Sequence, residues 1–314
     1  MSLRHIAIPS WPAARRPTLP TYALATRVQT ALQQAMLAWK ASASAPASTT
    51  DAAPRPSLIS FTPAPTYTLG RRQTEPLSAA ELARLKAPLL VSSSLSSSSS
   101  PEPASTFVPE VLHAPRGGLA TYHGPGQVVL WPVVDLRSPL HARLGVRQYT
   151  CVLEQTTIAA LRRLFGISGF ATANPGVWVR PSPPGGGGGG EERKIAALGV
   201  HLRRHVAALG VAVNLGMPVA GPEDANPWAR IVACGLHGRG VTSVAAHLGL
   251  SAAPSAERVA AVWAEEFAAR LGVRGGDGGN VELAVENDDW KAWERKLELD
   301  GADDEYVQGQ ALQT

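Results

Sequence analysis

Three low-complexity segments interrupt this chain and confine any folded core to the sequence between them. They are 41–57, rich in Ala, Ser and Pro, the serine run at 92–105, and 181–192, which contains six consecutive glycines. Such segments cannot bury enough apolar surface to offset the entropy of ordering them, so we predict three loop insertions. The rest predicts a single domain over 1–274, followed by an acidic, flexible tail at 275–314.

Apolar spacing predicts two long helices that each bury one face. The first spans 146–165 and gathers apolar residues on one side, namely Tyr149, Leu153, Ala160 and Leu164. The second begins after Ser255 as N-cap, ends at Gly272, and buries a face made of Val259, Trp263 and Phe267. A short helix within 77–85 carries a capping box, Ser78 followed by Glu81.

Strand patterns lie between the helices. We predict a strand and turn at 57–70, a buried strand at 127–136, and two strands, 194–202 and 210–215, joined by the turn "RRHVAAL". Pro132 lacks an N–H group, which places the 127–136 strand near a sheet edge or a bulge. Mixed helices and antiparallel strands predict an α/β or α+β class, one mixed sheet flanked by helices.

Charge is distributed unevenly along the chain. Of the 25 acidic residues 11 follow residue 274, against 3 of the 29 basic residues, so residues 1–274 carry a net charge of +12. A basic body can attract an acidic protein or nucleic acid, but the chain has no nucleic-acid motif, so we expect no nucleic acid partner. No run of about 18 or more apolar residues occurs, so no membrane span is predicted.

The first 50 residues contain basic side chains but no Asp or Glu. That bias is typical of a mitochondrial presequence. In a competing interpretation, "LRHIAIP" is a folded first strand and "YALATRVQTALQQAMLAWK" a helix of the domain. Both hold together if an uncleaved amino terminus also directs import, and we expect a mitochondrial location.

The chain has two cysteines, which cannot form a disulfide framework or a zinc site on their own and suggest a reducing compartment. Cys151 aligns with Ile158 and Phe165 on the 146–165 helix, so we predict a packed core thiol. Cys234 follows the strand-like "RIVA" and precedes Gly235, a place suited to a nucleophile, although the local sequence alone slightly favours a buried thiol beside a turn.

A thiol nucleophile needs a nearby cation to populate the thiolate near neutral pH. The candidates are His123, His237 and Lys194. Lys194 begins a strand with small residues, and the returning strand has Gly210 and Ala212. Small side chains on both strands leave room for a narrow apolar slot, with a cation at its mouth, that would suit a medium-length acyl chain.

Several motifs in order resemble the lipoyl(octanoyl) transferase family. They are "YTLGRR", "RGGLATYHGPGQVV", "PGVWV", "KIAALGVHLRR", "VAVNL" and "CG" before "VTS", spread over residues 3–272. The resemblance implies a fold like the catalytic domains of biotin and lipoate ligases. It also implies transfer of an octanoyl or lipoyl group from acyl carrier protein to a lysine of lipoyl domains, in the glycine-cleavage H protein and in 2-oxoacid dehydrogenase E2 subunits, as the first step of protein lipoylation.

The resemblance also implies roles for individual residues. Cys234 would be the acyl-thioester nucleophile, Lys194 would lower its pKa, and His123 would lie near the reacting carbonyl. No cofactor and no metal are implied. The acyl-substrate site would be formed by Arg116, Gly117, Gly118, Leu119, Ala120, Thr121, Tyr122, His123, Ala197, Leu198, Gly199, Gly210, Val211 and Ala212.

The chain departs from many relatives at two positions. Leu209 stands where they have a histidine, and Ala233 where they have a proline. Neither departure touches the nucleophile or the lysine, but both bear on acceptor preference. Two alternatives stay open: an ATP-dependent lipoate or biotin ligase on the same fold, and a non-catalytic adaptor that binds lipoyl domains.

Overall fold

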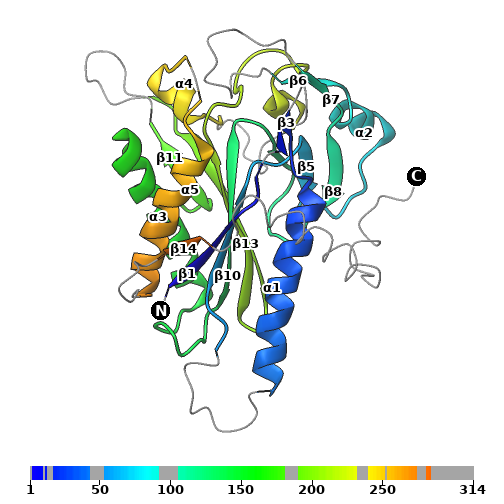
Figure 1. The fold of residues 1–314 in the computed structure, drawn as a ribbon. Helices are drawn as coiled ribbons and strands as arrows, with labels where there is room; N and C mark the ends of the chain where they lie inside the picture. Colours follow the sequence, from blue (N-terminus) through cyan, green and yellow to red (C-terminus); the bar gives the residue numbers. More distant parts are fainter. Residues whose placement is uncertain are drawn as a thin grey trace.

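The computed structural model describes residues 2–9, 11–12, 17–42, 53–91, 105–180, 190–231, 240–251, 253–273 and 281–283. Its centre is a seven-stranded mixed sheet (Figure 1). In spatial order the strands are β11 (Gly176–Val179), β12 (Arg193–Arg203), β13 (Val206–Asn214), β10 (Gln127–Asp135), β4 (Ser57–Phe61), β1 (Leu3–Ala7) and β14 (Val281–Leu283). Pairs from β11 to β4 are antiparallel, whereas β4–β1 and β1–β14 are parallel.

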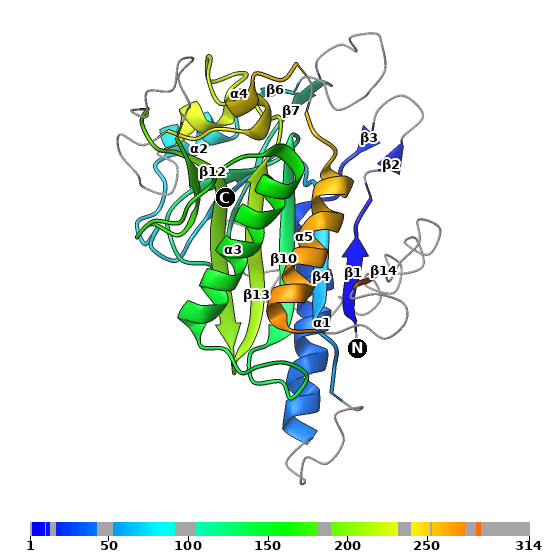
Figure 2. The same ribbon diagram turned by 90° about the vertical axis from the view of Figure 1, so that its left-hand side faces the viewer.

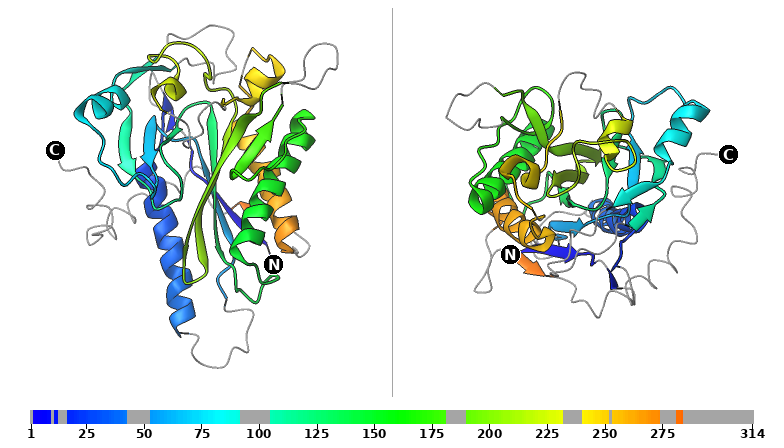
Figure 3. Two further views of the ribbon diagram at one scale, coloured as in Figure 1. Left: turned by 180° about the vertical axis from the view of Figure 1, so that it is seen from behind. Right: turned by 90° about the horizontal axis from the view of Figure 1, so that it is seen from above.

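Helices cover both faces of this sheet, as the end-on view in Figure 3 shows. On one face lies α1 (Tyr22–Ser42), whose apolar residues pack against β4, β10 and β13. On the other face α3 (Val146–Phe165) and α5 (Ala256–Leu271) lie side by side (Figure 2). Two cores result, one on each face, because strands buried on both sides direct successive side chains to opposite faces.

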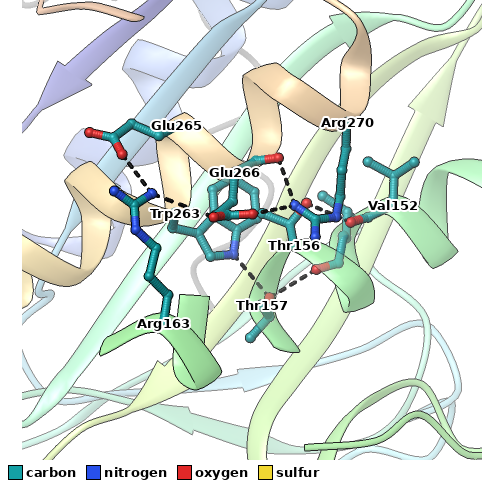
Figure 4. A network of polar contacts seen from close by, with 9 residues as sticks. Val152, Thr156, Thr157, Arg163, Trp263, Glu265, Glu266 and Arg270 are labelled. Carbon is teal, nitrogen blue, oxygen red and sulfur yellow. Dashed lines mark hydrogen bonds and ion pairs between the residues drawn. The ribbon is translucent and has the colours of Figure 1, made fainter. Parts of the chain in front are cut away.

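Polar contacts fix α3 against α5 within the second core (Figure 4). The indole N–H of Trp263 donates to Thr157 Oγ1 at 2.9 Å, and both residues are fully buried. At the exposed rim Arg163 forms ion pairs with Glu265 and Glu266 at 2.8 and 3.4 Å. The buried hydrogen bond sets the axial register of the two helices, whereas the exposed pairs contribute little to stability.

Three smaller sheets accompany the central sheet in the described part of the chain. A three-stranded sheet contains β8 (Glu110–His113), β5 (Thr66–Leu69) and β9 (Thr121–His123). The pairs β2 (Trp11–Pro12) with β3 (Pro17–Thr18), and β6 (Leu89–Val91) with β7 (Ser105–Phe107), form two more sheets. The protein thus has several sheets rather than the one that was predicted. The remaining helices are α2 (Ala79–Leu85), α4 (Val244–Leu248) and a 3-10 turn, Pro227–Arg230.

Most predicted helices are confirmed. The helix at 146–165 has the predicted bounds, and α5 begins after Ser255 and ends at Gly272. Ser78 and Glu81 form the expected capping box of α2. The amino-terminal strand and helix of the competing interpretation are present as β1 and α1.

The strands need more correction. Pro132 lies in β10, the central strand, so the predicted edge position is wrong. Its missing N–H is accommodated because β10 and β13 pair at Leu130 and Val134 but have no Cα partners between them. The connection between β12 and β13 is only Arg204-His205, both at positive φ, because Val206 to Leu209 already belong to β13.

Two local predictions about the cysteines also change. Cys151 is exposed on α3 and is not a core thiol. The "RIVA" segment begins with Arg230 at the end of the 3-10 turn rather than with a strand, and residues 232–239, including Cys234 and His237, lie outside the described residues.

The predicted insertions and tail fall largely outside the described ranges. Their described ends belong to elements: Ser42 ends α1, Ser57 begins β4 and Ser105 begins β7. Within the tail, β14 pairs with β1, and Glu282 accepts from Arg55 at 2.7 Å. Among the described residues no helix is both long and apolar enough to cross a bilayer.

Candidate active site

A cavity of about 370 Å³ lies on the α1 side of strands β12 and β13. Such a volume is in the usual range for small-ligand pockets. We call it the slot. Its walls come from α1, β10, the 116–123 segment, the 174–175 loop and both strands, together with Arg72 and with Thr150 of α3. The sequence motifs predicted as one site are therefore brought together from distant parts of the chain.

Small residues make room for the slot. Ala197 and Gly199 of β12, and Gly210 and Ala212 of β13, alternate with residues of the opposite core, such as Val211 and Val213. A Cβ on Gly199 would lie only 3.0 Å from Arg116 Cδ, so glycine lets this arginine lie against the strand. The small residues that the sequence analysis singled out thus line a cavity.

Arg116 holds the 116–123 segment in place. It is 8% exposed, and its guanidinium donates to Thr68 Oγ1 at 2.7 Å, to the Leu119 carbonyl at 2.8 Å and to the Gly117 carbonyl at 3.0 Å. These bonds join β5 to the glycine-rich turn, in which Gly118 has φ +86°. The turn needs a glycine there because other residues seldom adopt this backbone conformation.

Lys194 lies at one end of the slot and is 6% exposed. Its Nζ donates to the Pro175 carbonyl at 3.1 Å and lies 4.9 Å from the centre of the Trp178 ring. Its backbone pairs with the chain that follows the undescribed segment: Lys194 N–H donates to Gly240 and Thr242 N–H donates to Lys194, at 3.0 and 2.9 Å. A buried ammonium is thereby oriented by a carbonyl and an aromatic face.

Glu154 is an acidic neighbour of this lysine that the sequence analysis missed. It projects from α3, is 9% exposed, and its Oε1 accepts from the Gly176 N–H at 3.0 Å. Burial raises the pKa of Glu154, while the Gly176 hydrogen bond and the charge of Lys194 act in the opposite direction. The spacing of Glu154 within a helix gives no sign of this role, because the contact depends on how α3 packs against β11.

His123 is buried and electrically neutral near pH 7. Burial lowers its pKa to about 4, although the hydrogen bond to Gln127 opposes that shift. It is therefore not the cation that the sequence analysis considered for thiolate formation. Its ring packs 5.5 Å from Tyr22, centre to centre, and it lines the slot.

Neighbouring amides fix the tautomer of His123. Because the Thr242 carbonyl can only accept, Asn214 Nδ2 donates to it at 3.0 Å and Asn214 Oδ1 faces Gln127. Gln127 Nε2 donates to that oxygen at 2.9 Å, which leaves its Oε1 to accept from His123 Nδ1 at 2.8 Å. The His123 proton therefore sits on Nδ1, and Nε2 carries the lone pair.

Most of the predicted substrate-binding residues line the slot, together with Lys194. They are Arg116, Gly117, Gly118, Thr121, His123, Ala197, Leu198, Gly199, Gly210, Val211 and Ala212. Leu119, Ala120 and Tyr122 do not. Tyr122 instead packs between Tyr67 and Trp228, at ring-centre distances of 5.1 and 6.0 Å.

The segment that carries Cys234 is anchored on both sides by described residues. Before it, the guanidinium of buried Arg230 donates to the carbonyls of Ala87, Pro88 and Glu223 at 2.6–2.8 Å. After it, Gly240 to Thr242 pair with Lys194.

Tyr22 and Trp131 also line the slot, and their only sequence signal was their place in predicted apolar elements.

Comparison with known sequences places the chain in a family. Residues 26–268 match the lipoyl protein ligase A/B catalytic domain. A "Probable octanoyltransferase" of Schizosaccharomyces pombe is 34% identical over 60% of this chain and 67% of its own length. An octanoyltransferase of Xanthomonas campestris pv. campestris is 39% identical over 52% of this chain and 60% of its own length. The mitochondrial octanoyl-[acyl-carrier-protein]:protein N-octanoyltransferase LIPT2 of Xenopus tropicalis is 40% identical over 43% of this chain and 47% of its own length.

Solved structures agree on the fold. Protein Ta0514 of T. acidophilum, solved with bound lipoic acid, has a TM-score of 0.53 at 12% identity and covers 96% of both chains. LipL1 of P. falciparum, in complex with lipoate, has a TM-score of 0.54 at 9% identity and covers 94% of this chain and 70% of its own. The curated matches span about half to two thirds of those relatives' lengths. This chain belongs to the lipoyl protein ligase A/B catalytic domain family.

Proposed function

We propose that this protein transfers an octanoyl group from acyl carrier protein to a lysine of lipoyl domains. One observation carries the proposal: a buried lysine, Lys194, lies at one end of a slot lined by small residues and is joined by backbone pairing to the chain that follows Cys234. The octanoyltransferases among its sequence relatives support the same activity. The slot takes the acyl chain, and the reacting carbonyl lies at the Lys194 end.

The reaction proceeds through two acyl transfers. The thiolate of Cys234 attacks the thioester carbonyl, a new carbon–sulfur bond forms, and the carrier thiolate leaves and takes up a proton. The neutral amine of the acceptor lysine then attacks the acyl-enzyme carbonyl. An amide bond forms, the amine loses a proton, and the Cys234 thiolate is released for the next cycle.

Lys194 supplies the positive charge that favours the thiolate of Cys234. Its buried Nζ is held by the Pro175 carbonyl and the Trp178 ring, so the charge is oriented rather than dispersed in water. Glu154 lies beside Lys194, whose charge opposes the rise in the Glu154 pKa that burial causes, so the two groups attract each other when both are charged. Glu154 acts through Lys194 and is a positioning residue.

His123 serves the second transfer as a hydrogen-bond acceptor. It is neutral near pH 7, and Gln127 holds the proton on Nδ1. Its Nε2 lone pair accepts an N–H of the incoming lysine amine and orients the amine lone pair toward the acyl carbon. A cationic histidine would repel a protonated amine and could not accept.

Charge and location follow from the same proposal. The net +12 of residues 1–274 attracts acidic partners, and the carrier and the lipoyl domains, which we expect to be acidic, would be steered to this surface. We propose that the acceptors are the H protein and the E2 subunits. The basic, acid-free first 50 residues and the mitochondrial LIPT2 relatives support a mitochondrial location.

The test separates transferase from ligase. Purified protein is mixed with a lipoyl domain and either octanoyl-acyl carrier protein without ATP, or free octanoate with ATP and magnesium. We expect octanoylation of the lipoyl domain in the first mixture only. Octanoylation in the second mixture alone would make the protein a ligase, and binding of the lipoyl domain with no product in either mixture would make it an adaptor.

Two cysteine variants control this assay. Cys234→Ala removes the proposed nucleophile, and we expect no transfer. Cys151→Ala removes the exposed thiol on α3, which does not line the slot although its neighbour Thr150 does, and we expect activity close to that of the unaltered protein. Equal activity of the two variants would exclude an acyl-thioester on Cys234.

A further inference from the structure

A second cavity lies beyond the far end of the slot. It has a volume of about 360 Å³ and lies between α1 and the parts of β12 and β13 farthest from Lys194. Polar and basic side chains are among its lining residues, namely Gln29, Gln33, Arg71, His201 and Arg203, but apolar atoms also form part of its surface. Among the described residues only Tyr22 and Leu209 line both cavities, so these two side chains separate the slot from the second cavity.

The side chain of Leu209 reaches this position because the backbone turns it there. In β13, Val206 and Ala212 face α1, while Ala207, Val211 and Val213 face α3 and α5. Strict alternation would send Leu209 to the α3 side, since it lies two residues from both Ala207 and Val211. Instead it packs with the α1 core, at φ +61°.

This backbone conformation is unusual for leucine. Positive φ brings Cβ close to the backbone carbonyl oxygen, so glycine and asparagine occupy it far more often than a branched apolar residue. The strain sits at the junction of two cavities, and strained residues concentrate at sites where a side chain must occupy a particular place. The leucine residue is 4% exposed and lines the slot beside Gly210.

Register places Leu209 at the end of the slot opposite Lys194. The Lys194 ammonium group bonds the Pro175 carbonyl, next to Gly176, whose Cα partner is Ala197. Ala197 is three residues from Val200, the Cα partner of Leu209, or about 10 Å at the rise of a strand, which is close to the length of an octanoyl chain. His201 then lines the second cavity. An acyl chain whose carbonyl lies near Lys194 therefore extends toward Leu209.

We propose that Leu209, backed by Tyr22, is the end stop of the slot and sets the longest acyl chain that the protein accepts. The assignment of the slot to an acyl chain rests on the proposed function. The leucine side chain contacts the terminal methyl group and keeps it out of the second cavity. Removing the side chain joins the two cavities and admits a longer chain.

Direct binding tests this independently of catalysis. Affinities of hexanoate, octanoate and dodecanoate are measured by calorimetry for the unaltered protein, Leu209→Ala and Leu209→Gly. We expect octanoate to bind the unaltered protein at least tenfold more tightly than dodecanoate, and expect that ratio to fall at least tenfold in Leu209→Gly, with Leu209→Ala intermediate. Val206→Ala is the matched control, because Val206 lies in the same core and lines neither cavity.

Equal affinities for octanoate and dodecanoate in the unaltered protein, or an unchanged ratio in Leu209→Gly, would overturn the end stop. A shift of the same size in Val206→Ala would also overturn it, since loosening of the core would then explain the change. Transfer from octanoyl and dodecanoyl carrier protein is measured in parallel. Absence of transfer together with a Leu209-dependent binding ratio would reject the proposed function while leaving the end stop in place.

Discussion

Lys194 and His123 of the slot have different neighbours, and these neighbours decide which role each side chain can take. Lys194 is buried but keeps a carbonyl, an aromatic ring and a nearby carboxylate as neighbours. His123 is buried beside uncharged amides, so burial dominates and the ring stays neutral. His123 is therefore neutral, and Lys194 is the cation that we propose beside the Cys234 thiolate.

Loss of the Lys194 charge should raise the pKa of the Cys234 thiol. The rate of alkylation by iodoacetamide is measured against pH in a Cys151→Ser background, because Cys151 is exposed and would otherwise react. We expect the Lys194→Met curve to lie at higher pH, toward the ordinary thiol pKa of about 8.5. Glu154→Gln should move it in the same direction by less, and superimposable curves for all three proteins would contradict the role of Lys194.

At Leu209 the usual order of alanine and glycine should reverse. Glycine in a strand is ordinarily less stable than alanine by about 0.5–1 kcal/mol, but positive φ costs alanine about 1–2 kcal/mol. We therefore expect Leu209→Gly to have a free energy of unfolding at least equal to that of Leu209→Ala. The ordinary order is expected at its cross-strand partner Val200, and finding it at Leu209 as well would argue against the strained backbone.

Two buried histidines should make stability depend on pH. Burial lowers the pKa values of His5 and His123 to about 4, whereas the unfolded chain has values near 6.5. Between these values the unfolded chain binds more protons, so stability is retained above pH 6.5 and is lost as the pH falls toward 4. Urea unfolding at several pH values should show a shallower decline in His5→Gln, by about 1 kcal/mol per pH unit; an unchanged slope would contradict the burial of a neutral His5.

At the scale of elements, the helix ends were predictable from residues next to them in the sequence. The capping residues Ser78, Ser255 and Gly272 mark the ends of helices because they satisfy free backbone groups regardless of the rest of the fold. Cys151 was misplaced because burial on α3 depends on what packs against it. The loop after α3 returns over Ile158, where a Cβ on Gly169 would lie 3.5 Å from its Cγ1, but Cys151 stays exposed.

The parts of the site that are formed by glycines and other small residues were predictable from the sequence. The parts that depend on how helices pack against the sheet were not. The motif 116–123 and the residues 197–199 and 210–212 carry their own backbone signals, and most of them line the slot. Glu154 and Tyr22 come from helices on opposite faces of the sheet, and nothing in their spacing indicates the cavity they approach. Pro132 was misjudged for a similar reason, since the gap in its pairing is created by β13.

The α3–α5 pair offers a test of element packing. Thr157→Val keeps the shape of the side chain but leaves the Trp263 indole N–H buried without its acceptor, at a cost of about 1–3 kcal/mol in the free energy of unfolding. Thr156→Val is the matched control, because Thr156 Oγ1 bonds only the Val152 carbonyl of its own helix. Equal losses in the two variants would mean that the Trp263 hydrogen bond does not hold the helices together.

For the whole molecule, the slot is formed mainly on one face of the central sheet but receives residues from both faces. One face packs α3 and α5 into the larger core, while α1, β12, β13 and the glycine-rich 116–123 segment form most of the slot, to which α3 adds Thr150. Lys194 and His123, to which we assign catalytic roles, lie on strands β12 and β9, and the segment that carries Cys234 joins two anchored points, Arg230 and Gly240. This arrangement is consistent with the proposed route, in which one thiol would meet a donor and an acceptor protein in turn.

Intact-protein mass spectrometry tests this most directly. The Cys151→Ser protein is mixed with octanoyl-acyl carrier protein, without ATP and without an acceptor. The mechanism predicts a single octanoyl adduct that maps to Cys234 by peptide analysis and disappears when a lipoyl domain is added. An adduct on another residue, or no adduct while octanoylated lipoyl domain still accumulates, would contradict the acyl-thioester route.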